Sequence, residues 1–109
     1  MIREETVPIG DVRVIDGDTL AVTIRWGFHG ITAAVRLRLA GVDTQRGNTP
    51  AGKTATAYVQ EWLREAEAIR FRSDLAMTHG RYLAVVFRPL DGLSLNDALL
   101  ADGHAVPYL

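Results

Sequence analysis

Apolar and polar residues alternate through the first part of the chain in a way that indicates β-strands. The alternation predicts a first strand over about residues 7–14, with an irregularity at Gly10 that shifts the pattern. Second and third strands are expected over residues 20–26 and 31–40, joined by a turn at residues 27–30. The Asp-Gly signal at residues 16–18 is typical of a hairpin turn. The sequence therefore predicts a meander of three antiparallel strands.

The second half of the chain combines a helix with shorter strands. Residues 44–50 are polar and rich in turn formers, which indicates a loop. The helix that follows carries apolar residues at steps of three and four, namely Ala55, Tyr58, Val59, Trp62, Leu63 and Ala66. Short strands are expected over residues 69–72 and 83–87, with a turn at residues 78–80 between them.

A short helix is expected near the C-terminal end. Ser94 can cap its first turn together with Asp97, and Gly103 stands where the helix would end. Five strands with a helix between the third and the fourth are typical of the Greek-key OB-fold barrel. We therefore expect a β-rich α+β fold in which residues 1–109 form one OB-fold domain with a short C-terminal helix.

Two carboxylates at the first turn, Asp16 and Asp18, have two interpretations. They could supply turn chemistry alone, because Asp and Gly tolerate left-handed backbone. Alternatively, their oxygens could contribute to a site for calcium, which takes oxygen ligands from scattered positions. The second interpretation needs another carboxylate, and Asp43 supplies one just after the third strand.

The third strand carries Arg36 and Arg38 on the face opposite Leu37 and Leu39. Arg38, like Arg81 later in the chain, is either a solvated surface residue or a phosphate ligand, since a planar guanidinium can donate two parallel hydrogen bonds to phosphate oxygens. The alternation alone leaves both interpretations open.

Four segments follow one another in an order that carries a resemblance. They are Ile-Asp-Gly-Asp-Thr at residues 15–19, Arg-Leu-Ala-Gly-Val-Asp-Thr at 38–44, Gly-Arg-Tyr-Leu-Ala at 80–84, and Leu-Asn-Asp-Ala-Leu at 95–99 before Gly103. Together they make the chain similar to the thermonuclease, or staphylococcal nuclease-like, family over nearly its whole length. The resemblance implies an OB-fold and calcium-dependent hydrolysis of phosphodiester bonds in DNA and RNA.

The resemblance also implies a set of site residues. Asp18, Asp43 and the backbone carbonyl of Thr44 would hold calcium, with Asp16 close to them. Arg38 and Arg81 would bind the phosphate and stabilise the charge that develops on it during hydrolysis, which would make them both catalytic and substrate-binding residues.

His79 and Tyr82 are further candidates for contact with substrate. His79 stands where the family often has a tyrosine beside the phosphate, and Tyr82 could stack on a base of single-stranded DNA or RNA.

The chain departs from the family at the position of the catalytic glutamate, which is Arg46 here. An arginine cannot accept a proton at neutral pH, and its charge opposes calcium binding. Gln45 could still orient a water molecule, whereas Glu61 is expected on the solvated face of the helix. We therefore expect a weakened calcium site and weak or lost hydrolysis.

Composition limits the partners. Twelve Lys and Arg face 13 Asp and Glu, for a net charge of −1, which argues against strong non-specific binding to nucleic acid. Because Lys53 is the only lysine, any phosphate contact should be local and based on arginine. There is no cysteine, which excludes disulfides and thiolate metal sites.

A second function class remains open, a non-enzymatic OB-fold interaction or assembly module, for example in a virion or a larger complex. The family's type member carries another helix after Gly103, so a protein partner or a second copy could cover the C-terminal face at residues 107–109. No apolar run reaches the length of a signal peptide or a membrane span. We expect a cytoplasmic or virion-associated protein without a membrane partner.

Overall fold

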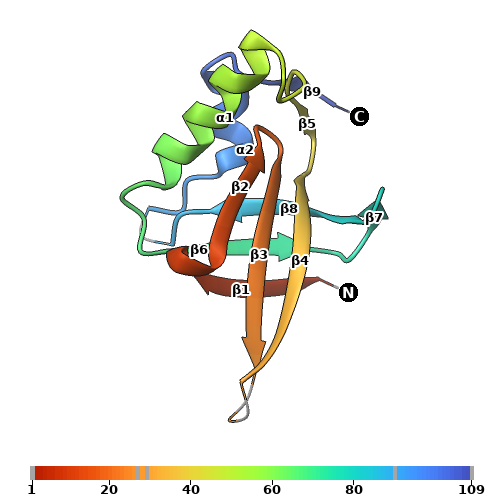
Figure 1. The fold of residues 1–109 in the computed structure, drawn as a ribbon, viewed down its shortest axis with the longest axis vertical. Coiled ribbons are helices and arrows are strands. Elements are labelled where there is room, and N and C mark those ends of the chain that lie inside the picture. Colours follow the sequence, from red (N-terminus) through yellow and green to blue (C-terminus); the bar gives the residue numbers. More distant parts are fainter. Residues whose placement is uncertain (1, 27, 29, 90, 109) are drawn as a thin grey trace.

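The computed structural model describes residues 2–26, 28, 30–89 and 91–108. Nine strands and two α-helices lie within these ranges (Figure 1). In chain order the elements are β1 (Arg3–Pro8), a 3-10 helix (Ile9–Asp11), β2 (Val12–Asp16), β3 (Thr19–Trp26), β4 (Ile31–Leu39), β5 (Val42–Asp43), α1 (Pro50–Leu63), β6 (Ala68–Ser73), β7 (Met77–Thr78), β8 (Arg81–Phe87), α2 (Leu95–Ala101) and β9 (Val106–Pro107).

The predicted meander is confirmed, because β2, β3 and β4 pair consecutively and antiparallel. The two later strands and both helices also occupy their predicted places. The helix α1 ends at Leu63, so Ala66 lies beyond it. The strands β5, β7 and β9 were not predicted, since two residues show no alternation. The predicted turn at residues 27–30 includes Gly27 and His29, which lie outside the described residues, as does Leu109.

The prediction of one continuous first strand with a bulge is wrong. The chain turns through the 3-10 helix Ile9–Asp11, so that β1 and β2 have different neighbours. The strand β1 pairs with β6, and β2 pairs with β3. Pro8 ends β1 because proline has no N–H to donate to a neighbouring strand.

The strands form a mixed sheet in the order β1-β6-β8-β4-β3-β2. The pairing of β4 with β8 is parallel, and the other pairs on this path are antiparallel. In Figure 1, β1, β6 and β8 run across the direction of β2, β3 and β4, while α1 and α2 lie at one end. The core between these elements includes Leu20, Leu37, Leu39, Val59, Ile69, Val86, Leu95 and Leu99. The closed five-stranded barrel remains a prediction.

The C-terminal helix has the predicted caps. The Ser94 hydroxyl accepts a hydrogen bond from the backbone N–H of Asp97 at 3.2 Å, and Gly103 follows the helix with a φ of 76°. Asn96, in the first turn of α2, is buried and ties the helix to the sheet. Its amide donates to the carbonyls of Ala40 and Ala84 and accepts from the N–H of Val86.

Two glycines are needed for close packing between segments. A Cβ on Gly17 would lie 2.8 Å from the Cβ of Ala55 and 2.9 Å from Oγ1 of Thr44. A Cβ on Gly52 would lie 1.6 Å from the carbonyl oxygen of Arg46. Neither glycine has a positive φ, so the left-handed turn chemistry considered for Gly17 does not explain it. At these two glycines the loop after β5 packs against the β2–β3 turn and the start of α1 too closely to admit a side chain.

A side-chain contact joins α1 to the end of α2. The Tyr58 hydroxyl donates a hydrogen bond to Oδ2 of Asp102 at 2.5 Å, and its ring lies 4.4 Å from the His104 ring. Burial and then the bond to Asp102 raise the pKa of Tyr58 from 10.0 to about 12.

Tyr58→Phe is expected to lower the free energy of unfolding at neutral pH by about 1 kcal/mol, because one hydrogen bond to a carboxylate is lost. Since the folded pKa is raised, this contribution is complete below pH 10.0 and disappears as the pH rises toward 12. Urea unfolding of both proteins at neutral and alkaline pH measures the difference, and a difference that did not shrink at alkaline pH would contradict this account.

Among the described residues, no helix is long and apolar enough to cross a membrane.

Candidate functional site

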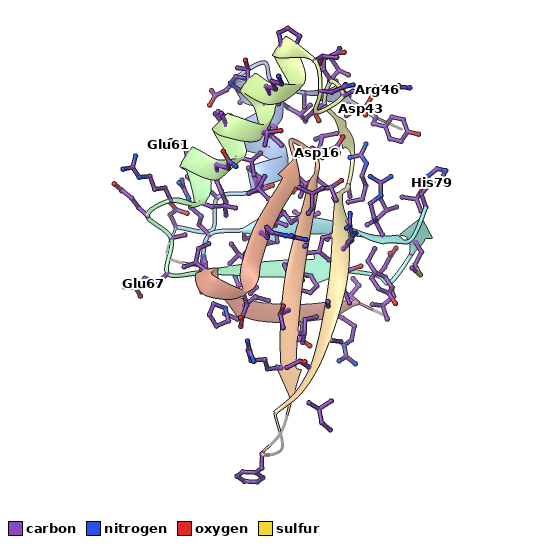
Figure 2. The ribbon with its side chains drawn as sticks, in the orientation of Figure 1. Asp16, Asp43, Arg46, Glu61, Glu67 and His79 are labelled. Atoms are coloured by element: carbon purple, nitrogen blue, oxygen red, sulfur yellow. The ribbon has the colours of Figure 1, made fainter. Side chains whose placement is uncertain are left out.

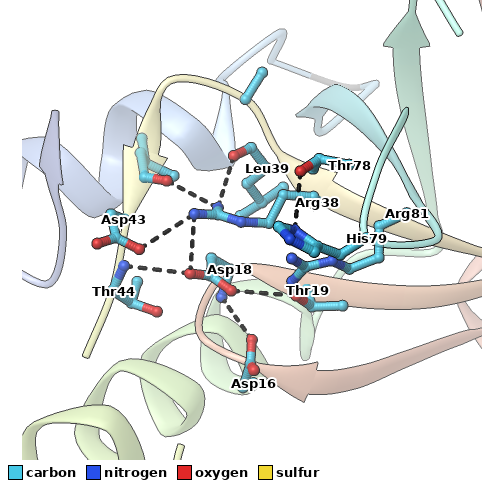
Figure 3. Close-up of polar contacts among 12 residues, drawn as sticks. Asp16, Asp18, Thr19, Arg38, Leu39, Asp43, Thr44, Thr78, His79 and Arg81 are labelled. Atoms are coloured by element: carbon cyan, nitrogen blue, oxygen red, sulfur yellow. Dashed lines mark hydrogen bonds and ion pairs between the residues drawn. The ribbon is translucent and has the colours of Figure 1, made fainter. Parts of the chain in front are cut away.

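Three carboxylates predicted from sequence gather at one end of the meander (Figure 3). Asp16 ends β2, Asp18 lies in the turn before β3, and Asp43 ends β5. An Asp16 carboxylate oxygen accepts the backbone N–H of Asp18 at 3.1 Å, and Oδ2 of Asp18 accepts the N–H of Thr44 at 3.3 Å. The β2–β3 turn is thereby joined to the segment after β5.

Arg38 occupies the centre of this group and is only 8% exposed. Its Nη1 donates to the carbonyls of Leu39 and Val42, while its Nη2 lies 3.4 Å from Asp18 and 3.2 Å from Asp43. The interpretation of Arg38 as a solvated strand residue is therefore wrong, although it holds for the exposed Arg36. Because Leu37 and Leu39 are also buried, both faces of β4 are covered at this end.

Arg81, at the start of β8, joins the same group through one intervening hydroxyl. Its Nη1 donates to Oγ1 of Thr19 at 3.1 Å, and that hydroxyl donates to Oδ1 of Asp18 at 3.1 Å. Asp18 therefore interacts with one arginine directly and with the other through Thr19. Arg81 is half-buried and has its guanidinium held beside the carboxylates.

The pKa values of the two carboxylates in the turn, Asp16 and Asp18, are shifted in opposite directions. Burial, followed by the neighbouring Asp18 carboxyl, raises the pKa of Asp16. Burial would also raise the pKa of Asp18, but hydrogen bonding with Asp16, the Arg38 charge and the Thr44 N–H together lower it. Asp18 thus remains the anionic member of the pair to lower pH, whereas Asp16 accepts a proton first.

Arg46 lies in the loop between β5 and α1, and its side chain is exposed (Figure 2). The backbone around it is well fixed, because its carbonyl accepts from the N–H and the hydroxyl of Thr49, the cap residue of α1. Glu61 is exposed on α1 and pairs with Arg64 at 3.4 Å, as expected for a solvated helix face. Glu61 therefore lies away from Asp16 and Asp43 (Figure 2).

His79 and Tyr82 take no part in the contacts described above among the residues that the structure describes. His79 is exposed on the turn between β7 and β8 with a φ of 50°, and its Nδ1 lies 3.1 Å from Oγ1 of Thr78. Tyr82 follows Arg81 on β8 and therefore faces the other side of the strand. There it packs against the core and lines an apolar cavity of about 230 Å³. Within the described residues, the hydrogen bonds of the carboxylate group reach neither side chain.

An aromatic residue covers part of Arg38. The Arg38 guanidinium carbon lies 5.6 Å from the ring centre of Tyr108, which follows β9 and remains 59% exposed. The pairing of β9 with β5 places Tyr108 there, and its N–H donates to the carbonyl of Gly41. A planar, exposed ring therefore lies at the edge of the arginine and carboxylate group.

The oxygen donors suit calcium in type, because Asp18, Asp43 and the Thr44 backbone lie on adjacent segments and offer hard oxygens. The guanidinium of Arg38 already bridges the two carboxylates, so it competes with a cation for the same oxygens. Among the described residues, no group of three or more His, Cys, Asp and Glu side chains is placed to hold a metal ion.

Sequence reasoning gave Thr19 no role of its own, yet its buried hydroxyl connects Arg81 with Asp18. Its place within the Asp-Gly-Asp-Thr motif was the available signal. The packing role of Gly52 had no signal in the sequence. No family model and no curated protein matches the chain.

Proposed function

We propose that this chain is a nucleic-acid phosphodiester-binding domain built on an OB-fold barrel. The barrel is supported by the first and last strands of the sheet order, β1 and β2, which are joined directly through the 3-10 helix Ile9–Asp11. One bent segment thus pairs with β6 at one edge of the sheet and with β3 at the other. In this proposal the shared segment closes the sheet into a small Greek-key barrel.

More particularly, the domain is thermonuclease-like, with weak or lost hydrolysis. The observation that carries this proposal is the convergence of Arg38 from β4 and Arg81 from β8 on Asp18 of the β2–β3 turn, the latter through the Thr19 hydroxyl. A phosphate needs several cationic donors held at fixed positions, and burial around Arg38 supplies that rigidity.

The two arginines differ in how readily they could receive a phosphate. The two Nη groups of Arg38 contact two carbonyls and two carboxylates, whereas Arg81 contacts Thr19 and is more open to solvent. Nη2 of Arg38 becomes available to a phosphate oxygen when another cation neutralises Asp18 and Asp43. Calcium held by Asp18, Asp43 and the Thr44 carbonyl would polarise the phosphate. Bound calcium would also strengthen phosphate binding, and bound phosphate would strengthen calcium binding by the same free energy.

Hydrolysis is impaired in this proposal because Arg46 stands at the position of the family's glutamate. Its guanidinium cannot deprotonate water at neutral pH, and the carboxylate of Glu61 is exposed and pairs with Arg64. Loss of a general base typically costs about 10²–10⁴-fold in rate.

The test measures binding and cleavage of fluorescently labelled single-stranded DNA and RNA, with calcium and with a chelator. We expect the natural protein to bind in calcium, Arg81→Ala to weaken binding about tenfold or more, and Arg70→Ala, at an exposed arginine of β6, to leave binding unchanged. Arg46→Glu is expected to raise the cleavage rate by about 10²-fold or more.

Binding that is equally insensitive to Arg81→Ala and Arg70→Ala would rule out the phosphate site. Cleavage by the natural protein that Arg46→Glu does not improve would show that another group acts as the base. Calcium titration by calorimetry tests the metal separately, and the absence of both heat and a thermal shift would remove calcium from the proposal.

An assembly module is the second candidate. It is favoured by two exposed apolar residues on the C-terminal face, Val106 and Tyr108, which are 61% and 59% exposed. In this case single-stranded nucleic acid does not bind, and a protein partner or a second copy protects Tyr108 from solvent. Tyrosine fluorescence quenching in the isolated and the assembled protein distinguishes the two candidates.

A further inference from the structure

The hairpin of β3 and β4 extends beyond the strands that flank it, forming an arm (Figure 1). We define the arm as residues 23–26 of β3 and 31–36 of β4. The strand β2 pairs with β3 only over residues 19–22, and β8 pairs with β4 only over residues 37–39. In the part of the chain that the structure describes, the two strands of the arm therefore pair only with each other.

The two outer edges of the arm are protected to different degrees. Beside β3, Arg25 donates two hydrogen bonds of 3.0 Å to the Asp11 carboxylate, which places a charged pair along that side. The edge of β4 over residues 31–35 reads Ile-Thr-Ala-Ala-Val and carries neither a charge nor a proline. Free strand edges normally carry such residues because they prevent pairing with another strand. The edge of β4 is thus open to a further strand.

The same stretch is complementary to itself. In an antiparallel pairing of two copies centred on Ala33, the alanine lies opposite its equivalent, and Ile31 of each copy lies opposite Val35 of the other. These three residues share one face of β4, and Val35 lines the apolar cavity of about 230 Å³ together with Leu37. Ile31, which is 62% exposed, would therefore cover an apolar surface of the second copy.

Charge does not oppose this register. Arg36 of one copy falls opposite Gly30 of the other, so no two like charges face each other across the pair. The net charge of −1 for each chain also keeps the long-range repulsion between copies small.

We propose that two copies of this chain form a symmetric dimer by antiparallel pairing of their β4 edges over residues 31–35, with Ala33 on the two-fold axis. The pairing adds backbone hydrogen bonds to an edge that pairs with no strand among the described residues, and it continues the sheet of one copy into the next. This surface is separate from the arginine and carboxylate group, so the dimer does not depend on the phosphodiester-binding proposal.

Sedimentation velocity over a concentration series tests the dimer with charges placed at its centre. Ala33→Glu and Ala33→Lys each put two like charges directly opposite each other, so each variant alone is expected to be monomeric. An equimolar mixture of the two is expected to restore a dimer, because opposite charges then meet. Ala57→Glu and Ala57→Lys, at an exposed alanine of α1, serve as matched controls and are expected to dimerise as the natural protein does.

Thermal unfolding verifies that each variant is folded. If an Ala33 variant does not fold, Ile31→Lys takes its place, because Ile31 lies on the same face of β4 and is more exposed. If the natural protein remains monomeric at about 1 mM, the proposal is overturned. Binding of an extended peptide to the β4 edge of such a monomer would not rescue the proposed dimer. A dimer that both Ala33 variants leave intact overturns it as well. Monomeric variants whose mixture stays monomeric overturn the symmetric register.

Discussion

Gly52→Ala is expected to lower the free energy of unfolding by roughly 3 kcal/mol or more, at the upper end of overpacking effects. The reason is the 1.6 Å between the new Cβ and the Arg46 carbonyl oxygen, a separation that requires the backbone to move. The Gln45 carbonyl oxygen, at 2.8 Å, limits the direction of that movement. Because Thr49 also holds the Arg46 carbonyl, the loop cannot yield without losing the cap of α1.

Gly10→Ala is the matched control, since nothing lies within 4 Å of its added Cβ and its φ is not positive. The free energy of unfolding of Gly10→Ala is expected to be unchanged or higher by about 0.4–1 kcal/mol, because alanine reduces the conformational entropy of the unfolded chain. Denaturant unfolding of the two variants beside the natural protein gives both values. If both variants lost the same free energy of unfolding, the close approach of the Arg46 carbonyl to Gly52 would not be the cause of the destabilisation.

Arg38→Met is expected to lower the free energy of unfolding at neutral pH by roughly 3–5 kcal/mol, because it leaves the Asp18 charge buried without its partner. Both side chains are nearly buried, with 9% and 11% of their surfaces exposed, so solvent screens the pair little. Methionine keeps much of the arginine's apolar volume, which restricts the change mainly to charge and hydrogen bonds. Arg36→Met, at an exposed position of the same strand, is expected to change stability by no more than about 0.5 kcal/mol.

The loss caused by Arg38→Met should depend on pH. Asp18 has a folded pKa below its ordinary value of 3.8, so its contribution is present above that pH and is lost as the pH falls through the folded pKa. In Arg38→Met the pKa of Asp18 is expected to be higher, because the guanidinium that lowers it is gone, and protonation of Asp18 then relieves the buried charge as the pH falls. The difference between the two proteins should therefore shrink below about pH 4, and urea unfolding at neutral and acidic pH measures it. A constant difference would assign the effect to packing alone.

Sequence reasoning succeeded where the signal is local. The Asp-Gly turn, the alternation of β3 and β4, the apolar stripe of α1 and the Ser94 cap each depend on neighbours within a few residues. It also selected the residues that meet at the site, since Asp18, Arg38, Asp43 and Arg81 were all named beforehand. That selection came from the resemblance, because no alternation pattern reports that distant strands place their ends together.

The features that were missed depend on three-dimensional contact. Burial of Arg38 on what looked like a solvent face follows from β8 and Tyr108 covering that end of β4. The split of the first strand follows from the distant partner of β1, the strand β6. The need for glycine at position 52 follows from a carbonyl in another segment. Each is a consequence of packing between segments that are far apart in the sequence.

The pairing of β1 with β6 has a consequence for the order of folding. Arg3 is paired with Ser73, so β1 cannot find its partner until the chain has been synthesised through β6. The meander of β2, β3 and β4 depends on local contacts and can form earlier. During synthesis, β1 therefore remains unpaired until β6 has been made. Its charged residues Arg3, Glu4 and Glu5 disfavour aggregation of this unpaired segment.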